Sequence, residues 1–129
     1  MAAERNRMMK AMSVALRELT KQTSFTHQTR DLAAFLVLAL DSISVSIERS
    51  VLPWEKRDYW VKADRFRMDW AWVEPLRLQL RKAVEGESLD DIAIGAATLA
   101  VKLKNIKVSE KHRLGSPWQG AWGKLNSIS

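Results

Sequence analysis

Apolar residues recur every three or four positions along most of this chain, and this spacing restricts it to helices. Between residues 3 and 22, Met8, Met12, Leu16 and Leu19 fall on one side when each residue turns the chain by about 100°. The opposite side carries the basic residues Arg7, Lys10, Arg17 and Lys21. The pattern predicts an amphipathic helix with one buried stripe.

A second helix is predicted from about residue 27 to residue 52. The preceding segment "TSFT" supplies Ser and Thr for the helix start, and the helix itself is apolar on nearly every side. Such a helix belongs in the centre of a fold. Within it, residues 41–48 ("DSISVSIE") alternate as a strand does, but no second alternating segment exists for a strand to pair with. We therefore expect this segment to be helical.

Pro53 is expected to end or redirect the chain, and a third helix is predicted from about residue 56 to residue 85, closed by Gly86. Pro75 lies inside this pattern and cannot donate to the carbonyl of Ala71, so we expect a kink or break over residues 73–76, with Glu74 extended. One seam of this helix carries the residues expected in the core: Tyr59, Ala63, Phe66, Trp70, Val73, Leu80 and Val84.

Two further helices follow. Ser88 is a good N-cap with acidic residues in the first turn, and it begins a fourth helix that fades near residue 104. Ser116 and Pro117 predict a short helix over residues 117–125 that presents Trp118 and Trp122 on one side. The expected fold is therefore all-α: one domain, residues 1–129, forming an up-down four-helix bundle with the third helix kinked or broken near Pro75 and a short C-terminal capping helix.

Composition narrows the function classes. The chain has no cysteine, which excludes disulfides, thiolate catalysis and cysteine-ligated metals. Its longest apolar run, residues 32–40, has nine residues, less than half of a bilayer crossing, and we expect a cytoplasmic protein with no membrane span. The net charge of +6 is concentrated at the two ends, since residues 1–30 carry six basic and two acidic side chains and residues 102–129 carry six and one. If the two ends meet in the fold, they form one positive face.

Candidate catalytic and metal groups are sparse. No Glu-x-x-His motif is present, which disfavours a di-iron site in a helical bundle. His27 and Asp31 are spaced for one metal, but two ligands fall short of a site and the pair is better explained as a surface or capping contact. His112 lies near Ser109 and Ser116 without an acid placed to orient it. We expect no cofactor, no metal and no enzymatic activity.

The most unusual stretch is residues 54–72, "WEKRDYWVKADRFRMDWAW", in which four tryptophans alternate with basic residues. Such a mixture is typical either of a surface that stacks bases or of a packed helix with a charged outer face. Its acidic residues leave a net charge of only +1, so we favour the packed helix, with Phe66 and Trp70 buried and Lys62, Arg65 and Asp69 turned outward. Trp54, Trp60, Met68 and Trp72 fall outside the seam, where the C-terminal tail, another subunit or a ligand is expected to cover them.

Two hypotheses for function follow. The first is a non-enzymatic helical interaction or adaptor module, as a homodimer or with another protein, with the candidate partner surface Trp54, Trp60, Met68, Trp72, Trp118 and Trp122. The alternative is binding of nucleic acid or another polyanion through the basic ends, with the candidate contacts Arg7, Lys10, Arg17, Lys21, Lys107, Lys111 and Arg113. A pocket for a small apolar ligand at the Pro75 kink is a third and weaker hypothesis.

Overall fold

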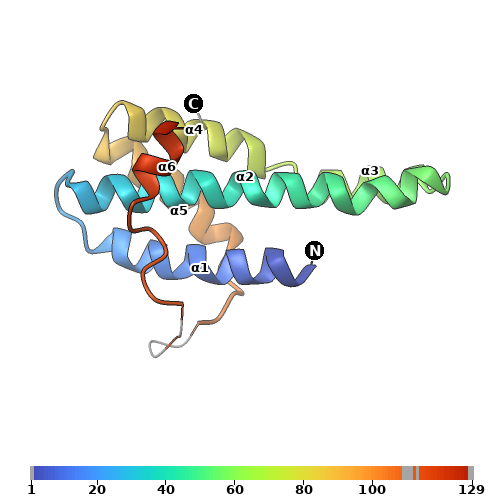
Figure 1. Ribbon diagram of the computed structural model, residues 1–129, viewed down its shortest axis with the longest axis horizontal. Helices are drawn as coiled ribbons and strands as arrows, with labels where there is room; N and C mark the ends of the chain where they lie inside the picture. The colour runs from blue at the N-terminus through green and yellow to red at the C-terminus, as the bar shows by residue number, and fades with distance from the viewer. Residues whose placement is uncertain (1, 109–111, 113, 128–129) are drawn as a thin grey trace.

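The computed structural model describes residues 2–108, 112 and 114–127, and no β-strand occurs among them. These residues form six helices (Figure 1): α1 (Ala2–Thr20), α2 (His27–Lys56), α3 (Trp60–Asp69), α4 (Val73–Glu85), α5 (Leu89–Lys102) and α6 (Ala121–Ser127). The prediction of an all-helical fold is confirmed.

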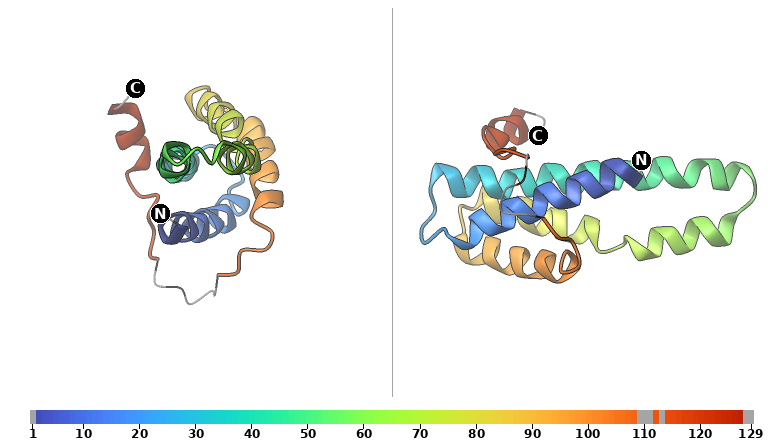
Figure 2. Two further views of the ribbon diagram at one scale, coloured as in Figure 1. Left: turned by 90° about the vertical axis from the view of Figure 1, so that its right-hand side faces the viewer. Right: turned by 90° about the horizontal axis from the view of Figure 1, so that it is seen from below.

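Helix α2 is the central element. Helices α1, α3, α4 and α6 all pack against it, and α5 packs mainly against α4. In the end-on view of Figure 2, α4 and α6 lie on opposite sides of α2. Leu32, Leu36 and Leu40 of α2 have no exposed surface, and they belong to a core that includes Met12 of α1 and Leu80 of α4. The expectation of a central, apolar second helix is therefore correct.

The alternating segment at residues 41–48 is helical, as expected. Its serines do not disrupt the helix because their hydroxyls bond back to helix carbonyls. Ser46 Oγ donates to the carbonyl of Ile43 at 2.7 Å, and Ser50 Oγ donates to that of Ser46 at 3.0 Å. The small serine side chains also leave room for Arg5 of α1, which contacts both of them.

Pro53 does not end the second helix, and this prediction is wrong. Helix α2 continues through Pro53 to Lys56, since the carbonyl that loses its partner belongs to Arg49, a solvent-exposed residue. The helix ends instead at a left-handed residue, Asp58, with φ of 63°. The amide of Asp58 donates to the carbonyl of Glu55 at 3.1 Å and that of Tyr59 to the carbonyl of Trp54 at 2.8 Å, which is a Schellman motif.

The predicted third helix is two helices, α3 and α4, separated at residues 70–72. The break lies just before the expected position because Pro75 conflicts with the carbonyl of Ala71, four residues earlier. Pro75 itself lies in the first turn of α4, where backbone amides lack intrahelical partners in any case. Glu74 is therefore helical, and the expectation that it is extended is wrong.

Helices α4 and α5 form a tight pair. Helix α4 ends at Glu85 as Gly86 predicted, but the left-handed residue is Glu87, with φ of 52°. Ser88 caps α5 as predicted, its hydroxyl accepting from the amide of Asp91 at 3.2 Å. Gly95 lets α5 approach α4 closely, because a Cβ at this position would lie 2.9 Å from Cγ of Leu80.

The C-terminal helix begins later than predicted. Residues 117–120 form a turn and α6 starts at Ala121, because Gly120 has a left-handed φ of 75° that a helix interior does not accept. Trp118 therefore lies in the turn and is buried, whereas Trp122 lies on α6 and is half-buried. We had expected the two tryptophans one turn apart on a single helix, and this expectation is wrong.

Candidate interaction surface

The end of α2 and all of α3 form a helical hairpin that extends beyond α1, α4 and α5 (Figure 1). We call residues 48–69 the arm. We call the other helices, α1, α4, α5 and α6, together with residues 27–47 of α2, the body. Only two arm residues, Val51 and Ala63, are buried, and neither belongs to the main core cluster. A ten-residue helix such as α3 is too short to be stable alone in water, so other contacts must hold it.

The first such contact is a row of aromatic rings. Trp54 and Phe66 meet edge to face with centroids 5.2 Å apart, Phe66 and Trp70 lie at 6.4 Å, and Trp70 stacks on Trp72 at 6.0 Å. These geometries are among those that aromatic pairs prefer. The row joins α2, α3 and the turn before α4, and all four residues are half-buried.

Cations from α1, α3 and α5 lie over these rings. Nζ of Lys62 is 4.5 Å from the ring centroid of Trp54, and Nζ of Lys102 is 5.6 Å from that of Trp72. The guanidinium carbon of Arg5 is 5.1 Å from the Phe66 centroid and 5.8 Å from that of Trp70. Basic residues interleaved with aromatics therefore serve internal packing here. Trp54 and Trp72 are half-buried, and their rings pack against other residues of this chain.

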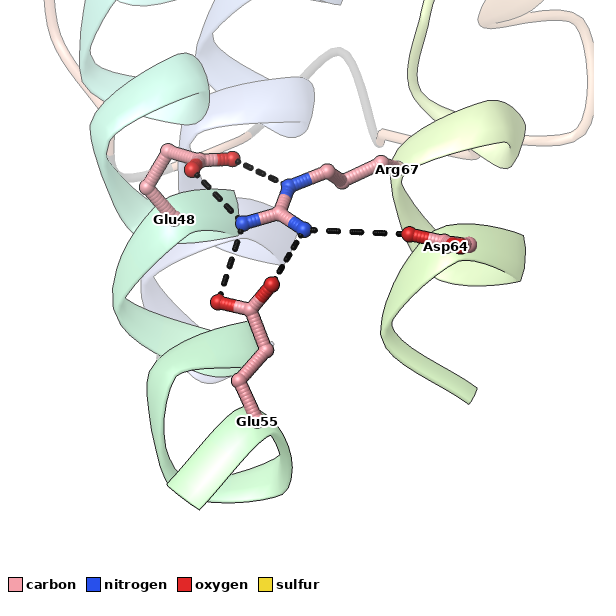
Figure 3. Close-up of polar contacts among 4 residues, drawn as sticks. All are labelled: Glu48, Glu55, Asp64 and Arg67. Carbon is pink, nitrogen blue, oxygen red and sulfur yellow. Dashed lines mark hydrogen bonds and ion pairs between the residues drawn. The ribbon is translucent and has the colours of Figure 1, made fainter. Parts of the chain in front are cut away.

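The second contact is an ion network around Arg67 of α3 (Figure 3). Its Nη1 donates to Glu55 Oε2 at 2.7 Å, and its Nε donates to Glu48 Oε2 at 3.1 Å. Nη2 bridges the same two carboxylates at 3.2 Å and 3.1 Å, and Asp64 lies 4.0 Å from Nη1. The planar guanidinium thus joins two turns of α2 to α3 through bidentate pairs.

This network shifts the acid–base equilibria of its members. The hydrogen bond and charge of Arg67 hold the pKa of Glu55 below its ordinary value near 4.5. The hydrogen bonds to Glu55 and Glu48 raise the pKa of Arg67, so it stays protonated throughout the range in which the protein folds. We call this ion network the clamp. Acid is expected to weaken it by protonating Glu55, whereas base is not expected to weaken it, because Arg67 keeps its proton.

A separate pair stabilises the start of α4. Glu74 accepts from Arg77 one turn later and from Ser44 of α2, whose hydroxyl lies 3.1 Å away. The hydrogen bond of Arg77 is the largest cause that holds the pKa of Glu74 below its ordinary value, and Glu74 in turn raises the pKa of Arg77. This pair belongs to the body and ties α4 to α2.

The outer side of the arm carries exposed apolar side chains among charged ones. Trp60 is 52% exposed, Val61 74% and Met68 75%, and Leu52 and Tyr59 are exposed as well. Trp54, Val61 and Phe66 line a shallow groove of about 470 Å³ whose charged lining is Lys62, Arg65 and Asp69. The outward orientation expected of these three charged residues is confirmed. Of the predicted partner surface, Trp60 and Met68 are the residues that remain accessible on the arm.

Trp118 and Trp122 lie elsewhere. Helix α6 packs on the first part of α2, and Asp31 accepts from the amides of Gly120 and Trp122 at 3.2 Å and 3.0 Å. The guanidinium of Arg30 lies 5.3 Å from the Trp122 ring. The described part of the tail therefore does not cover Trp60 and Met68, and Trp118 and Trp122 do not form one surface with them.

The predicted polyanion contacts are only partly brought together. The guanidinium of Arg17 donates to the carbonyl of Val108, so the tail crosses α1 next to Lys107. Lys21 pairs with Glu18 at 3.1 Å, while Arg7, Lys10 and Lys107 are exposed. Lys111 and Arg113 lie outside the described residues. The structure thus brings Arg17 against the tail segment that carries Lys107.

The two histidines and Asp31 make separate contacts within the described part of the chain. Asp31 is used to anchor α6, and His27 contacts Arg30 through Nδ1 at 2.9 Å. Nδ1 of His112 accepts from the amide of Leu114 at 3.2 Å, whereas Ser109 and Glu110 lie outside the described residues. Among described residues, no three His, Cys, Asp or Glu side chains gather as metal ligands do.

Sequence reasoning missed three residues that organise the arm and the tail. Arg5 and Arg67 were given no structural role, and Asp31 was considered only with His27. The one signal in the sequence was the presence of three acidic residues, Glu48, Glu55 and Asp64, within about twenty positions of Arg67. Which of them face each other depends on the helix pairing.

Within the described residues, no helix is both long and apolar enough to cross a membrane. Comparison of the chain with protein-family models, with curated proteins and with solved structures finds no match.

Proposed function

We propose that this protein is a non-enzymatic helical interaction module that pairs with a second copy through the outer face of α3. The body, which we take to be an up-down four-helix bundle, would serve as the scaffold that presents the arm. The observation that carries this proposal is the exposure of Val61 and Met68 on a helix whose inner side is held by specific contacts.

The chemistry of the inner side supports an interaction role. Arg67, the aromatic row and Lys62 fix α3 on α2 without burying its larger aliphatic side chains. A helix that served only to cover α2 would turn Val61 and Met68 inward, because burying apolar side chains is the larger source of stability. Exposed apolar clusters of this kind on folded domains are typical of interaction sites.

The sequence of the outer face supports a second copy as the partner. Val61 and Met68 are two turns apart on one face, and Asp64 and Arg65 lie between them on the same side. If two α3 helices cross antiparallel about a twofold axis at residues 64–65, Val61 meets Met68 of the partner and Asp64 meets its Arg65. The pattern is therefore self-complementary, as an isologous interface requires.

Light scattering after size-exclusion chromatography, over a series of concentrations in the micromolar range, tests self-association. We expect the wild type to dimerise and Met68→Glu to be monomeric, since the substitution buries an unpaired charge. Leu78→Glu is the matched control, because Leu78 is 53% exposed on α4, outside the arm, and this variant should dimerise as the wild type does. A wild type that stays monomeric at every concentration contradicts the proposal.

A charge swap tests the crossing geometry. Asp64→Arg and Arg65→Asp should each weaken the dimer, because each places like charges opposite one another across the twofold axis. The double variant, Asp64→Arg with Arg65→Asp, should restore it. A dimer that forms in the wild type but ignores these charges would be built on another face.

The tail crossing favours a second candidate, binding of a polyanion by the basic ends. The contact of Arg17 with Val108 places Lys107 beside α1, whose exposed basic residues include Arg7 and Lys10. Binding of single- or double-stranded nucleic acid that weakens steeply with salt would support it. Lys10→Glu together with Lys107→Glu should then abolish binding while leaving self-association unchanged.

A further inference from the structure

We propose that a small oxyanion binds where the first turns of α1 cross the middle of α2, with Arg5 as its principal ligand. A cavity of about 290 Å³ lies at this crossing, lined by Arg5 and Arg7 of α1, Ser42 and Ser46 of α2, and Glu4. The site is separate from the outer face of α3 and does not depend on self-association.

Arg5 is a largely buried arginine that has no carboxylate paired with it in the described part of the chain. Arg5 is 9% exposed, yet no carboxylate of the described residues lies within ion-pair distance of it. Buried guanidinium groups in proteins are ordinarily paired with an anion, because leaving water is unfavourable for an unpaired charge. A bound oxyanion would supply the negative charge that the described residues do not place beside Arg5.

The neutral groups around Arg5 use only part of its hydrogen-bonding capacity. Nη1 donates to Ser50 Oγ at 3.0 Å and reaches Ser46 Oγ and the Ser46 carbonyl at 3.4 Å, which are long bonds. A guanidinium has five N–H donors, and those on Nε and Nη2 have no partner among the described residues. The Nε–Nη2 edge is one that binds a carboxylate or phosphate through two parallel hydrogen bonds.

The rest of the lining defines the ligand. Arg7 adds a second cation, and the exposed hydroxyl of Ser42 is a further donor, whereas the proton of Ser46 Oγ is directed to the Ile43 carbonyl. Glu4 opposes one of the two cations, so the charged lining sums to a single positive charge, which favours a small oxyanion of low charge over a polyphosphate. The cavity lies below the usual size of sites for drug-sized ligands, so a small carboxylate or a phosphate monoester is the class that fits.

Occupancy of this site would also affect the arm. Arg5 lies over the rings of Phe66 and Trp70, so an anion that fixes its guanidinium also fixes the cation that these rings contact. The tryptophan next to Arg5 therefore provides a built-in fluorescence signal for binding.

The test is a titration of the full chain with sodium phosphate and, separately, with sodium acetate, at constant ionic strength maintained with sodium chloride. Tryptophan fluorescence and calorimetry report binding. Saturable binding of either anion supports the site. Comparison of the two titrations shows whether the site prefers a tetrahedral or a planar oxyanion. The absence of saturable binding for both anions overturns the proposal.

Two variants locate the binding without removing Arg5, which also makes structural contacts with α2 and with the ring of Phe66. Ser42→Asp places a negative charge in the cavity at an exposed position and should weaken binding about tenfold or more. Thr23→Asp, which makes the same charge change at an exposed loop residue that does not line the cavity, should leave the affinity unchanged. Equal affinity in the wild type and Ser42→Asp assigns the anion to another place and also overturns the proposal.

Discussion

In the body, Leu32, Leu36 and Leu40 of α2 have no exposed surface, whereas in the arm only Val51 and Ala63 are buried to that degree. The body is thus held by apolar burial, and the arm by the Arg67 network, a row of rings and the cations above them. The difference shows how one chain can keep a helix in place while leaving its aliphatic side chains outside. Directional contacts on the inner side make apolar burial there unnecessary.

The largest effect is expected from a cavity in the body. Leu36→Ala should lower the free energy of unfolding by about 2–5 kcal/mol, because it removes buried methyl groups and leaves a void. Urea denaturation followed by circular dichroism measures it. Leu52→Ala, at a 52% exposed leucine of the arm, should change stability by no more than about 0.5 kcal/mol. Comparable losses for both variants would contradict the contrast between body and arm.

A smaller effect is expected where α5 meets α4. Gly95→Ala should cost about 1–3 kcal/mol, because the added Cβ would lie 2.9 Å from Cγ of Leu80, a side chain with no room to move. Gly123→Ala in α6 meets no atom within 4 Å and should be neutral or stabilising by up to about 1 kcal/mol. Thermal unfolding of the two variants side by side measures the difference. If Gly95→Ala were neutral, the helix pair would be looser than described.

Next in size is the anchor of the tail. Asp31→Ala removes both acceptors from the amides of Gly120 and Trp122 and should cost about 0.5–2 kcal/mol, the range of lost helix caps. Hydrogen exchange should show α6 opening while α2 stays protected. Gln28→Ala, at an exposed position one turn earlier on α2, should leave α6 closed. Global unfolding of Asp31→Ala would mean that α6 is part of the body's cooperative core.

The smallest effect on overall stability is expected from acid in the arm. Its consequence should be confined to α3. Because the pKa of Glu55 is lowered in the folded state, its contribution is complete above about pH 4.5 and is lost as the pH falls through the lowered pKa. Hydrogen exchange of α3 should accelerate in that range. The variant Glu55→Gln should show the faster exchange already at neutral pH.

Glu74 has a lowered pKa as well, so acid also weakens the start of α4. The comparison of Glu55→Gln with the wild type at neutral pH isolates the clamp, since Glu74 is ionised in both proteins. Unchanged exchange of α3 in the variant would show that the rings alone hold the arm.

Much of the fold follows from local pattern. The spacing of Met8, Met12 and Leu16 predicts α1, and Ser88 predicts the start of α5. The errors in helix boundaries occur at prolines and glycines, and a separate error concerns Tyr59, which was expected in the core and is 53% exposed. Helix α2 continues through Pro53 because the carbonyl that Pro53 leaves unpaired belongs to an exposed residue. Helix α6 is shorter than predicted because Gly120 has a left-handed φ.

The candidate site was only partly predictable. The sequence correctly places Lys62, Arg65 and Asp69 outside, but it does not distinguish Trp54 and Trp72, which are packed, from Trp60, which is exposed. Trp54 and Trp60 differ because one meets Phe66 across the α2–α3 pair and the other does not. Nothing in the local spacing records that pairing.

The sequence by itself determined that this chain is helical, where α1, α2 and α5 begin, and which face of these helices is apolar, because these properties depend on residues within a turn or two of one another. Only the tertiary structure decided that Arg67 faces Glu48 and Glu55, that Arg5 lies over Phe66 and Trp70, and that Asp31 holds α6. Each of these contacts joins residues from different helices or across a chain reversal, so it depends on how the helices pack, which local periodicity does not specify.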